Sequence, residues 1–153
     1  MSARSINMDV QIQQITNDEK ELVLIRCHEV TEEVKEIASF VRSRQGSLSA
    51  VSESKQYEVA VTDISYIESV DGKTFLYTDE RVYETAYRIY ELEELLKPKH
   101  FLRVSKPMLV NLMKIRSIQP ALNGRFTAVL RSGEKIIIAR NYVKALKTAL
   151  KGE

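Results

Sequence analysis

Apolar and polar positions alternate near the start of the chain in a pattern that predicts two strands. Residues 9–15 place Val10 and Ile12 between polar neighbours, and residues 21–30 are mostly β-branched or apolar. The residues between these segments, 16–18 (Thr-Asn-Asp), favour a turn. We therefore expect a β-hairpin in this part of the chain.

A helix is predicted next, over residues 31–44. Its apolar residues at helical spacing are Val34, Ile37, Ala38 and Val41. Thr31 is a good N-cap, and the acidic first turn and basic last turn match the helix dipole. Hairpin and helix make a small β-β-α piece over residues 1–46, which is too small to hold a large core alone. The serine-rich segment 45–56 is interpreted as the linker that follows it.

From residue 57 onward the pattern predicts many short strands. They are expected at 57–61, 64–70, 73–78, 81–84, 102–104, 115–119, 126–130 and 135–139. Asp71-Gly72 is a tight-hairpin signal between two of them. Helices are predicted over 85–97, just before Pro98, and at the C-terminus, where apolar residues again form a stripe. The fold class is therefore mainly β (α+β), with few helices.

Charge is distributed unevenly along the chain, although the net charge is only +2. Residues 47–96 carry 4 basic and 11 acidic side chains, whereas residues 97–153 carry 13 basic and 2 acidic ones, a net charge of +11. The stretch 101–115, FLRVSKPMLVNLMKI, contains no acidic residue. Such concentrated positive charge predicts a polyanionic partner, and nucleic acid is the first candidate. The alternative is that the acidic middle packs beside the basic end and neutralises it.

Several classes of function lack the residues that they need. One cysteine, Cys27, excludes an internal disulfide framework, and with only two histidines it leaves no metal cluster or catalytic dyad. No glycine-rich phosphate loop is present, and strand alternation would place Asp63 and Glu68 on opposite faces. We therefore expect no cofactor, no metal and no enzymatic activity. A signal-peptide core and a run of about 18 apolar residues are both missing, so a cytoplasmic protein is expected.

Four blocks of sequence, in order, resemble the LytTR family of bacterial DNA-binding domains. They are DISYIESVDGK (63–73), RIYELEELL (88–96), FLRVSKPMLVN (101–111) with IRSI (115–118), and LRSGEKIIIARNYVKALK (130–147). The resemblance implies an elongated domain of mostly antiparallel strands, which binds DNA through projecting loops and bends the duplex. It also implies a role in the regulation of transcription.

The DNA-contacting elements of that family correspond to three short segments of this chain. The first follows the ES of the opening strand and points to Lys73, and the second follows RV in the third block and points to Ser105 and Lys106. The third is the start of the last helix, at Arg140 and Asn141. Arginine can read guanine with two hydrogen bonds, asparagine can read adenine, and a helix start favours phosphate. The alternative for each residue is an ordinary solvated position.

Two positions beside these segments depart from the family pattern. Pro107 and Ala139 stand where the family usually has serine. Proline removes a backbone donor and fixes φ, so the second contact loop is expected to have its own geometry. The loss of a serine N-cap before the last helix is expected to cost about 1 kcal/mol of helix stability. Asn111 matches a family asparagine and is interpreted as structural, satisfying backbone groups.

Other basic residues are candidates for contacts with phosphates rather than bases. They are Arg103, Lys114, Arg116, Arg125, Lys144 and Lys147. For Arg103 there is a second interpretation, an ion pair with an acidic residue of the middle segment. The tyrosines of that segment are expected in the core and at its rim rather than stacked on bases.

The prediction is a stand-alone, sequence-specific transcriptional regulator whose residues 47–153 bind double-stranded DNA. The 46 residues before them are too few for a receiver domain, so control by an attached phosphorylated receiver is not expected. They are expected to form a homodimer or to dock a partner, and the resemblance implies a small membrane protein as one such partner. The alternative function is a protein-interaction module whose basic end binds an acidic protein or an anionic membrane surface.

Overall fold

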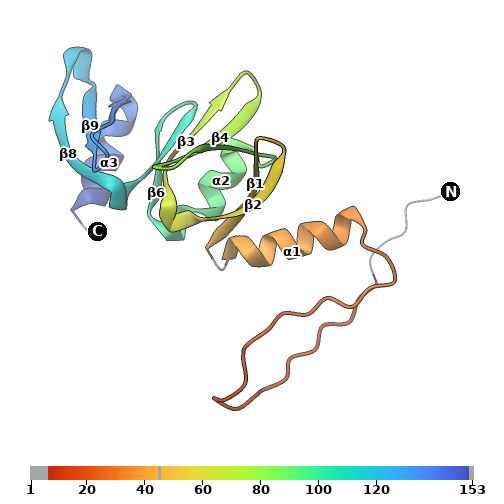
Figure 1. Cartoon of the computed structure of the whole chain (residues 1–153). Coiled ribbons are helices and arrows are strands. Elements are labelled where there is room, and N and C mark those ends of the chain that lie inside the picture. The colour runs from red at the N-terminus through yellow and green to blue at the C-terminus, as the bar shows by residue number, and fades with distance from the viewer. Residues whose placement is uncertain (1–6, 45, 152–153) are drawn as a thin grey trace.

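The computed structural model describes residues 7–44 and 46–151, whose strands form two antiparallel sheets (Figure 1). The larger sheet has the strand order β2-β1-β5-β4-β3-β7-β6, and the smaller one β10-β9-β8. The strands are β1 (Ser47–Ser52), β2 (Lys55–Ala60), β3 (Ile64–Val70), β4 (Lys73–Thr78), β5 (Val82–Thr85), β6 (Phe101–Ser105), β7 (Met108–Asn111), β8 (Ile115–Pro120), β9 (Phe126–Leu130) and β10 (Lys135–Ile138). The α-helices of the described part are α1 (Glu32–Arg44), α2 (Ile89–Leu95) and α3 (Val143–Leu150). The mainly β, antiparallel class is confirmed.

The larger sheet curls around α2 and encloses the first of two cores (Figure 1). Leu92 and Leu96 are fully buried there against apolar side chains of the surrounding strands. The N–H of Arg88 donates to the Glu91 carboxylate (2.8 Å), which marks the start of α2. The helix is shorter than the predicted one at both ends, because Thr85 belongs to β5 and Lys97 belongs to a separate 3₁₀ turn.

The smaller sheet and α3 enclose the second core together with β6 and β7. Ile136 and Ile138 of β10 are buried with Leu146 of α3, while the residue between the two isoleucines is exposed, as strand alternation requires. The N–H of Ala139 donates to the carbonyl oxygen of Val104 (2.8 Å). This bond ties the end of β10 to β6 and so joins the two sheets.

The prediction of a linker over residues 45–56 was wrong, because β1 and the start of β2 occupy most of it; residue 45 lies outside the described part. In β1, Leu48 and Ala50 are buried and Ser49 between them is only half-buried, so a strand of period two lies within a serine-rich segment. The hairpin turns at Glu53 and Ser54, whose φ angles are +51° and +66°. Such left-handed pairs usually carry asparagine or glycine, so the turn gave no sequence signal.

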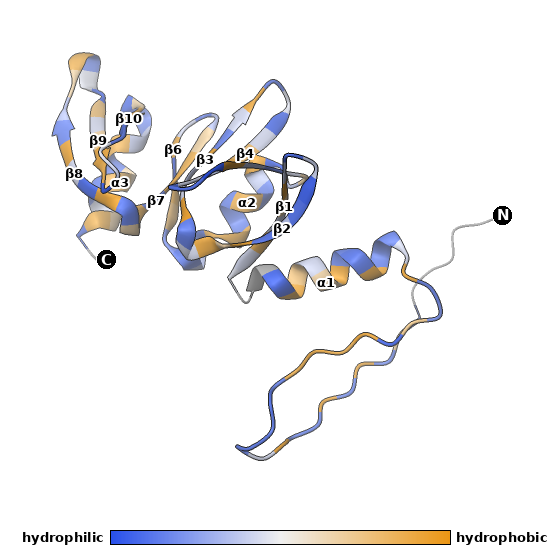
Figure 2. Ribbon diagram, viewed as in Figure 1, coloured by the Kyte–Doolittle hydropathy of each residue, from blue (hydrophilic) through white to orange (hydrophobic). Residues whose placement is uncertain are grey.

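The predicted strands over residues 9–15 and 21–30 are corrected as well. The chain does turn between them, where the N–H of Glu19 donates to the carbonyl oxygen of Thr16 (3.2 Å), but neither segment is a strand. They run as two arms away from the sheets, with apolar and polar stretches along their length (Figure 2). Their side chains enter no core, as Ile12 illustrates at 95% exposure, and a lone hairpin in water is marginal at best.

The helix α1 connects these arms to the larger sheet and begins where the sequence predicts. Thr31 Oγ1 accepts a hydrogen bond from the Val34 N–H (3.3 Å), which confirms the N-cap. The helix packs beside β1, and Ser39 shares a 2.5 Å hydrogen bond with the Tyr87 hydroxyl. Among the helices of the described residues, none combines the length and the apolar character that crossing a membrane requires.

Candidate nucleic-acid interface

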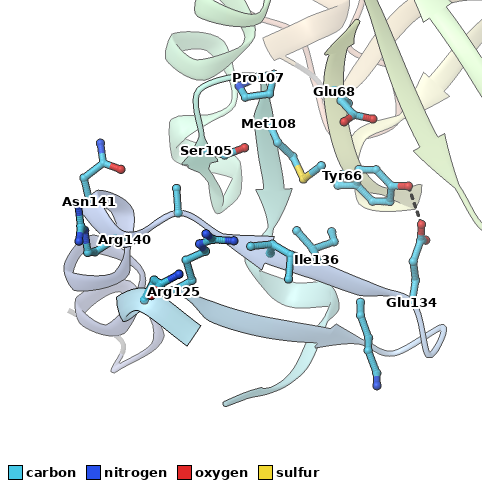
Figure 3. Close-up of a pocket in the computed structure, with 14 residues that line it drawn as sticks. Tyr66, Glu68, Ser105, Pro107, Met108, Arg125, Glu134, Ile136, Arg140 and Asn141 are labelled. Carbon is cyan, nitrogen blue, oxygen red and sulfur yellow. Dashed lines mark hydrogen bonds between the residues drawn. The ribbon is translucent and has the colours of Figure 1, made fainter. Parts of the chain in front are cut away.

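A cavity of about 780 Å³ opens between the β6–β7 turn, the smaller sheet and the residues that precede α3. It brings together four residues that the sequence singled out. They are Ser105, Arg125, Arg140 and Asn141. Figure 3 shows Arg125, Arg140 and Asn141 at one end of the cavity and the pair Tyr66 and Glu134 at the other. One end is therefore cationic and the other carries a carboxylate.

The cationic end is built on η5, the single 3₁₀ turn Arg140–Tyr142 that leads into α3. Arg140 and Asn141 are exposed, and no acidic residue lies in this turn. Ala139 is the N-cap in extended conformation, and no side chain caps the turn. The start of η5 is held by backbone bonds of Ala139, whose N–H donates to the Val104 carbonyl oxygen of β6 (2.8 Å) and whose carbonyl oxygen accepts the Tyr142 N–H (2.9 Å).

The side chain of Arg140 packs against the turn between β8 and β9. Gly124 in that turn has a φ of +76°, and a Cβ built on it would lie 2.8 Å from Cδ and 3.0 Å from Cγ of Arg140. The preceding Asn123 is also left-handed, with φ +60° and ψ +37°. Asn123 and Lys135 both line the cavity, and neither was predicted as a site residue. The turn itself was visible as Asn-Gly in the sequence, but its contact with Arg140 depends on the tertiary fold.

The β6–β7 turn, at the rim of the cavity, is held by Arg103. The Arg103 Nη1 donates to the carbonyl oxygen of Lys106 (2.6 Å), and its Nη2 lies 3.1 Å from Glu93 of α2. Arg103 therefore forms the ion pair with the middle segment that was one of its two predicted interpretations, and its side chain is only 15% exposed. Pro107 accepts a hydrogen bond from the Ser69 N–H (2.8 Å), which fixes the turn to β3.

The remaining predicted contact residues do not line the cavity. Lys106 is exposed in the β6–β7 turn, and Lys73 is exposed at the tip of the β3–β4 hairpin, next to the left-handed residues Asp71 and Gly72. The phosphate candidates just before β8, on β8 and on α3 are likewise outside it. They are Lys114, Arg116, Lys144 and Lys147. All four are at least partly exposed, and the Lys147 Nζ lies 4.5 Å from the centre of the Phe126 ring.

The acidic end of the cavity is a hydrogen-bonded bridge between the two sheets. The Tyr66 hydroxyl of β3 donates to Glu134 Oε2 in the β9–β10 turn, at 2.6 Å. The Tyr66 ring stacks on Tyr77, with centroids 4.3 Å apart and planes 10° from parallel. Burial, followed by the bond to the Glu134 carboxylate, raises the pKa of Tyr66 well above its usual value. Tyr66 is buried, as expected for a tyrosine of the core. Glu68 is a second carboxylate that lines the cavity at this end.

Asn111 has the structural role that was predicted. It is 3% exposed, its Nδ2 donates to the Ile64 carbonyl oxygen (2.9 Å), and its Oδ1 accepts from the Met113 N–H (3.0 Å). The side chain thus satisfies backbone groups at the end of β7. Across the described part of the chain, no three His, Cys, Asp or Glu side chains are grouped to hold a metal ion.

Comparison with known proteins identifies the fold. A solved LytTr DNA-binding domain from Bacillus cereus superimposes with a TM-score of 0.65 at 23% identity, covering 69% of this chain and 96% of that domain. The sensory transduction protein LytT of Bacillus anthracis is 33% identical over 93 residues, which are 61% of this chain and 38% of that protein. The transcriptional regulatory protein YpdB of Escherichia coli K12 is 29% identical over 111 residues, 72% of this chain and 46% of that protein.

The chain thus spans less than half the length of these curated relatives. The family model described as the LytTr DNA-binding domain matches residues 54–151, which is more than half of the chain. That span contains both sheets except β1, and it contains every residue of the cavity. The chain belongs to the LytTR family of DNA-binding domains.

Proposed function

We propose that this protein is a sequence-specific transcriptional regulator that binds double-stranded DNA through residues 47–153. The observation that carries the proposal is the cavity, which gathers Ser105, Arg125, Arg140 and Asn141 from three separate segments of a DNA-binding domain. Their chemistry suits a duplex, because guanidinium and amide groups can pair with base edges and phosphates alike. The proposal assigns no catalytic step and no cofactor to the protein.

Base reading is assigned to the cationic end of the cavity. Arg140 has the hydrogen-bonding fork that matches guanine, and Asn141 has the amide that matches adenine. Ser105 and Lys106 are assigned to the second contact element, in a turn that Arg103 and Pro107 hold in place. This braced turn supports a fixed contact geometry, since a loop that is ordered beforehand loses less entropy when it binds.

Affinity is assigned to cations outside the cavity. The candidates for phosphate contacts are Lys114, Arg116, Lys144 and Lys147, with Arg125 at the cavity wall. Lys73, at the tip of the β3–β4 hairpin and outside the cavity, is proposed as a further contact with the duplex. We propose that the duplex bends to meet this tip and the cavity together, which would favour easily deformed sequences.

Residues 1–46 are assigned to protein partners. The arms and α1 leave apolar side chains exposed, among them Val10, Ile12 and Leu22. A homodimer would cover such surface and would place two DNA-binding domains on a repeated site. A small membrane protein is the alternative partner that the family resemblance implies. The same resemblance, together with a DNA ligand, supports a bacterial, cytoplasmic setting for the regulator.

Selection of preferred duplexes from a random pool tests this function. The purified chain is bound to the pool, retained duplexes are sequenced, and the affinity of an enriched duplex is compared with that of a scrambled one across salt concentrations. About five neutralised phosphates predict a log–log salt slope near −4 to −5. Enrichment of a short motif, repeated about one helical turn apart, would support a dimeric regulator.

Salt-sensitive binding without any enriched motif would overturn the proposal. It would favour the alternative function, in which the basic end binds an acidic protein or an anionic membrane surface and DNA affinity is incidental. A scrambled duplex is the deciding control, because incidental binding cannot distinguish it from the selected sequence.

A further inference from the structure

Gly124, between the cavity residues Asn123 and Arg125, is a feature that the proposed function leaves unexplained. It lies in the β8–β9 turn, far from Arg140 in sequence, yet a Cβ at this position would approach Arg140 Cδ to 2.8 Å and Cγ to 3.0 Å. Contacts below 3.0 Å are essentially never formed by real Cβ atoms. The atoms approached belong to the stem of the arginine and not to its mobile end, so a single methyl group could be accommodated only by moving the whole side chain.

We infer that Gly124 is a positioning residue, which sets the direction of the Arg140 guanidinium and thereby the sequence preference of the protein. This inference rests on the proposed role of Arg140 in reading bases. An arginine stem has several rotatable bonds and would otherwise sample many directions, at an entropic cost when it binds. Because Gly124 has no side chain, the Arg140 stem can lie flat against the turn. This contact restricts the rotamers that Arg140 can adopt.

The backbone of the turn supports this geometry. Asn123 and Gly124 are both left-handed, with φ of +60° and +76°, so the chain reverses within two residues directly beneath the arginine. Asparagine and glycine are the residues that adopt this conformation at least cost. The pair therefore supplies two things at once, a tight reversal and a surface without a side chain.

The chain contains a matched control for the backbone strain of a substitution. Gly133 has a φ of +95°, and a Cβ built there meets no atom within 4 Å. Gly124→Ala and Gly133→Ala both place alanine at a left-handed position, but only the first collides with Arg140. A larger loss of binding in Gly124→Ala than in Gly133→Ala is therefore attributed to the contact with Arg140, and the Arg140→Ala background tests that attribution.

The test combines these variants with Arg140→Ala in a double-mutant cycle, using a duplex selected from the random pool and a scrambled one. We expect Gly124→Ala to lower the affinity for the selected duplex about tenfold, which is within the range for losing one base contact. The affinity for the scrambled duplex should fall by less than about twofold. Gly133→Ala should change both by less than about twofold. In the Arg140→Ala background, Gly124→Ala should have no further effect on either duplex.

A second measurement does not depend on DNA. The Nε–Hε signal of Arg140, followed by ¹⁵N relaxation in the free protein, should show greater mobility or a new position in Gly124→Ala and neither in Gly133→Ala. An unchanged signal in Gly124→Ala would overturn the inference, as would additive losses in the cycle. If Arg140→Ala binds both duplexes like the unchanged protein, the assigned role of Arg140 is wrong, whatever the relaxation data show at Gly124. The two failures are therefore distinguishable.

Discussion

The bridge between Tyr66 and Glu134 provides a direct test of how the two sheets are held together. Tyr66→Phe removes only the hydroxyl, and the remaining ring can still stack on Tyr77. A hydrogen bond to a charged group contributes about 1.5–3 kcal/mol to stability. Because Glu134 is exposed and regains water when the bond is lost, we expect a loss at or just below the lower end of that range, about 1–1.5 kcal/mol.

Urea unfolding followed by circular dichroism measures this loss. For an m-value of about 1–3 kcal/mol/M, the midpoint should fall by roughly 0.3–1.5 M while m stays constant. Tyr90→Phe is the control, because Tyr90 is 65% exposed. Removal of its hydroxyl should leave the midpoint unchanged. Equal midpoints for the two variants would refute the reasoning, because the bridge would then contribute nothing to the free energy of unfolding.

The same bridge predicts a pH dependence. Burial and the Glu134 carboxylate raise the pKa of Tyr66 in the folded protein above the value of about 10 in the unfolded chain. A raised folded pKa means that the folded state holds the proton more tightly. The stabilisation is therefore complete below about pH 10 and decreases as the pH rises toward the folded pKa. The difference in stability between the unchanged protein and Tyr66→Phe should be constant from pH 7 to 9 and shrink above pH 10.

Three further substitutions of cations, with Glu93→Gln as a comparison for one of them, separate the roles of the cations. Arg140→Ala should cost about 1–3 kcal/mol of binding to a selected duplex and reduce its preference over a scrambled one, measured by fluorescence anisotropy; unchanged binding would show that the family register at η5 is wrong. Lys147→Ala should weaken both duplexes about equally and reduce the magnitude of the salt slope by about 1, and a change in preference instead would contradict a phosphate contact. Arg103→Ala should lower the free energy of unfolding by about 1–2 kcal/mol, because both the Glu93 ion pair and the bond to the Lys106 carbonyl are lost. Glu93→Gln should cost less in the same urea assay, since the bond to the turn remains.

Much of the sheet was predictable because local signals and tertiary structure agree. β3 and β4 lie where the sequence predicted them, since Asp71-Gly72 supplies the tight turn and alternation supplies the register. The β1–β2 hairpin was missed because its turn, Glu53-Ser54, lacks the usual residues. The strand β7 was not predicted, because the expected strand over 102–104 was followed by Ser105-Lys106-Pro107 and no second strand was assigned to the short apolar segment after the proline. The strand prediction for the arms before α1 was wrong for the opposite reason. Their sequence has a strand-like pattern, but in the described residues they pair with no strand.

The site was predictable only in part, for a related reason. The family motif placed Arg140 and Asn141 at the start of the last helix, and the structure has them there. Nothing in the local sequence could show that Gly124 lies beneath Arg140, or that Glu134 reaches Tyr66 across two sheets. These contacts join residues that are distant in the chain, so they follow from the packing of the sheets and not from any local periodicity.

Under the proposed function, affinity and discrimination belong to different surfaces. The exposed cations Arg116, Lys144 and Lys147 lie on β8 and α3, away from the cavity, and they would attract any duplex through its phosphates. The cavity instead holds Arg140 at one end and Glu134 at the other. The Glu134 carboxylate would repel a phosphate at that end, whereas Lys135, the next residue, also lines the cavity and would attract one. The net charge of +11 in the last third therefore relates to affinity and its salt dependence, whereas sequence preference depends on the few residues of the cavity.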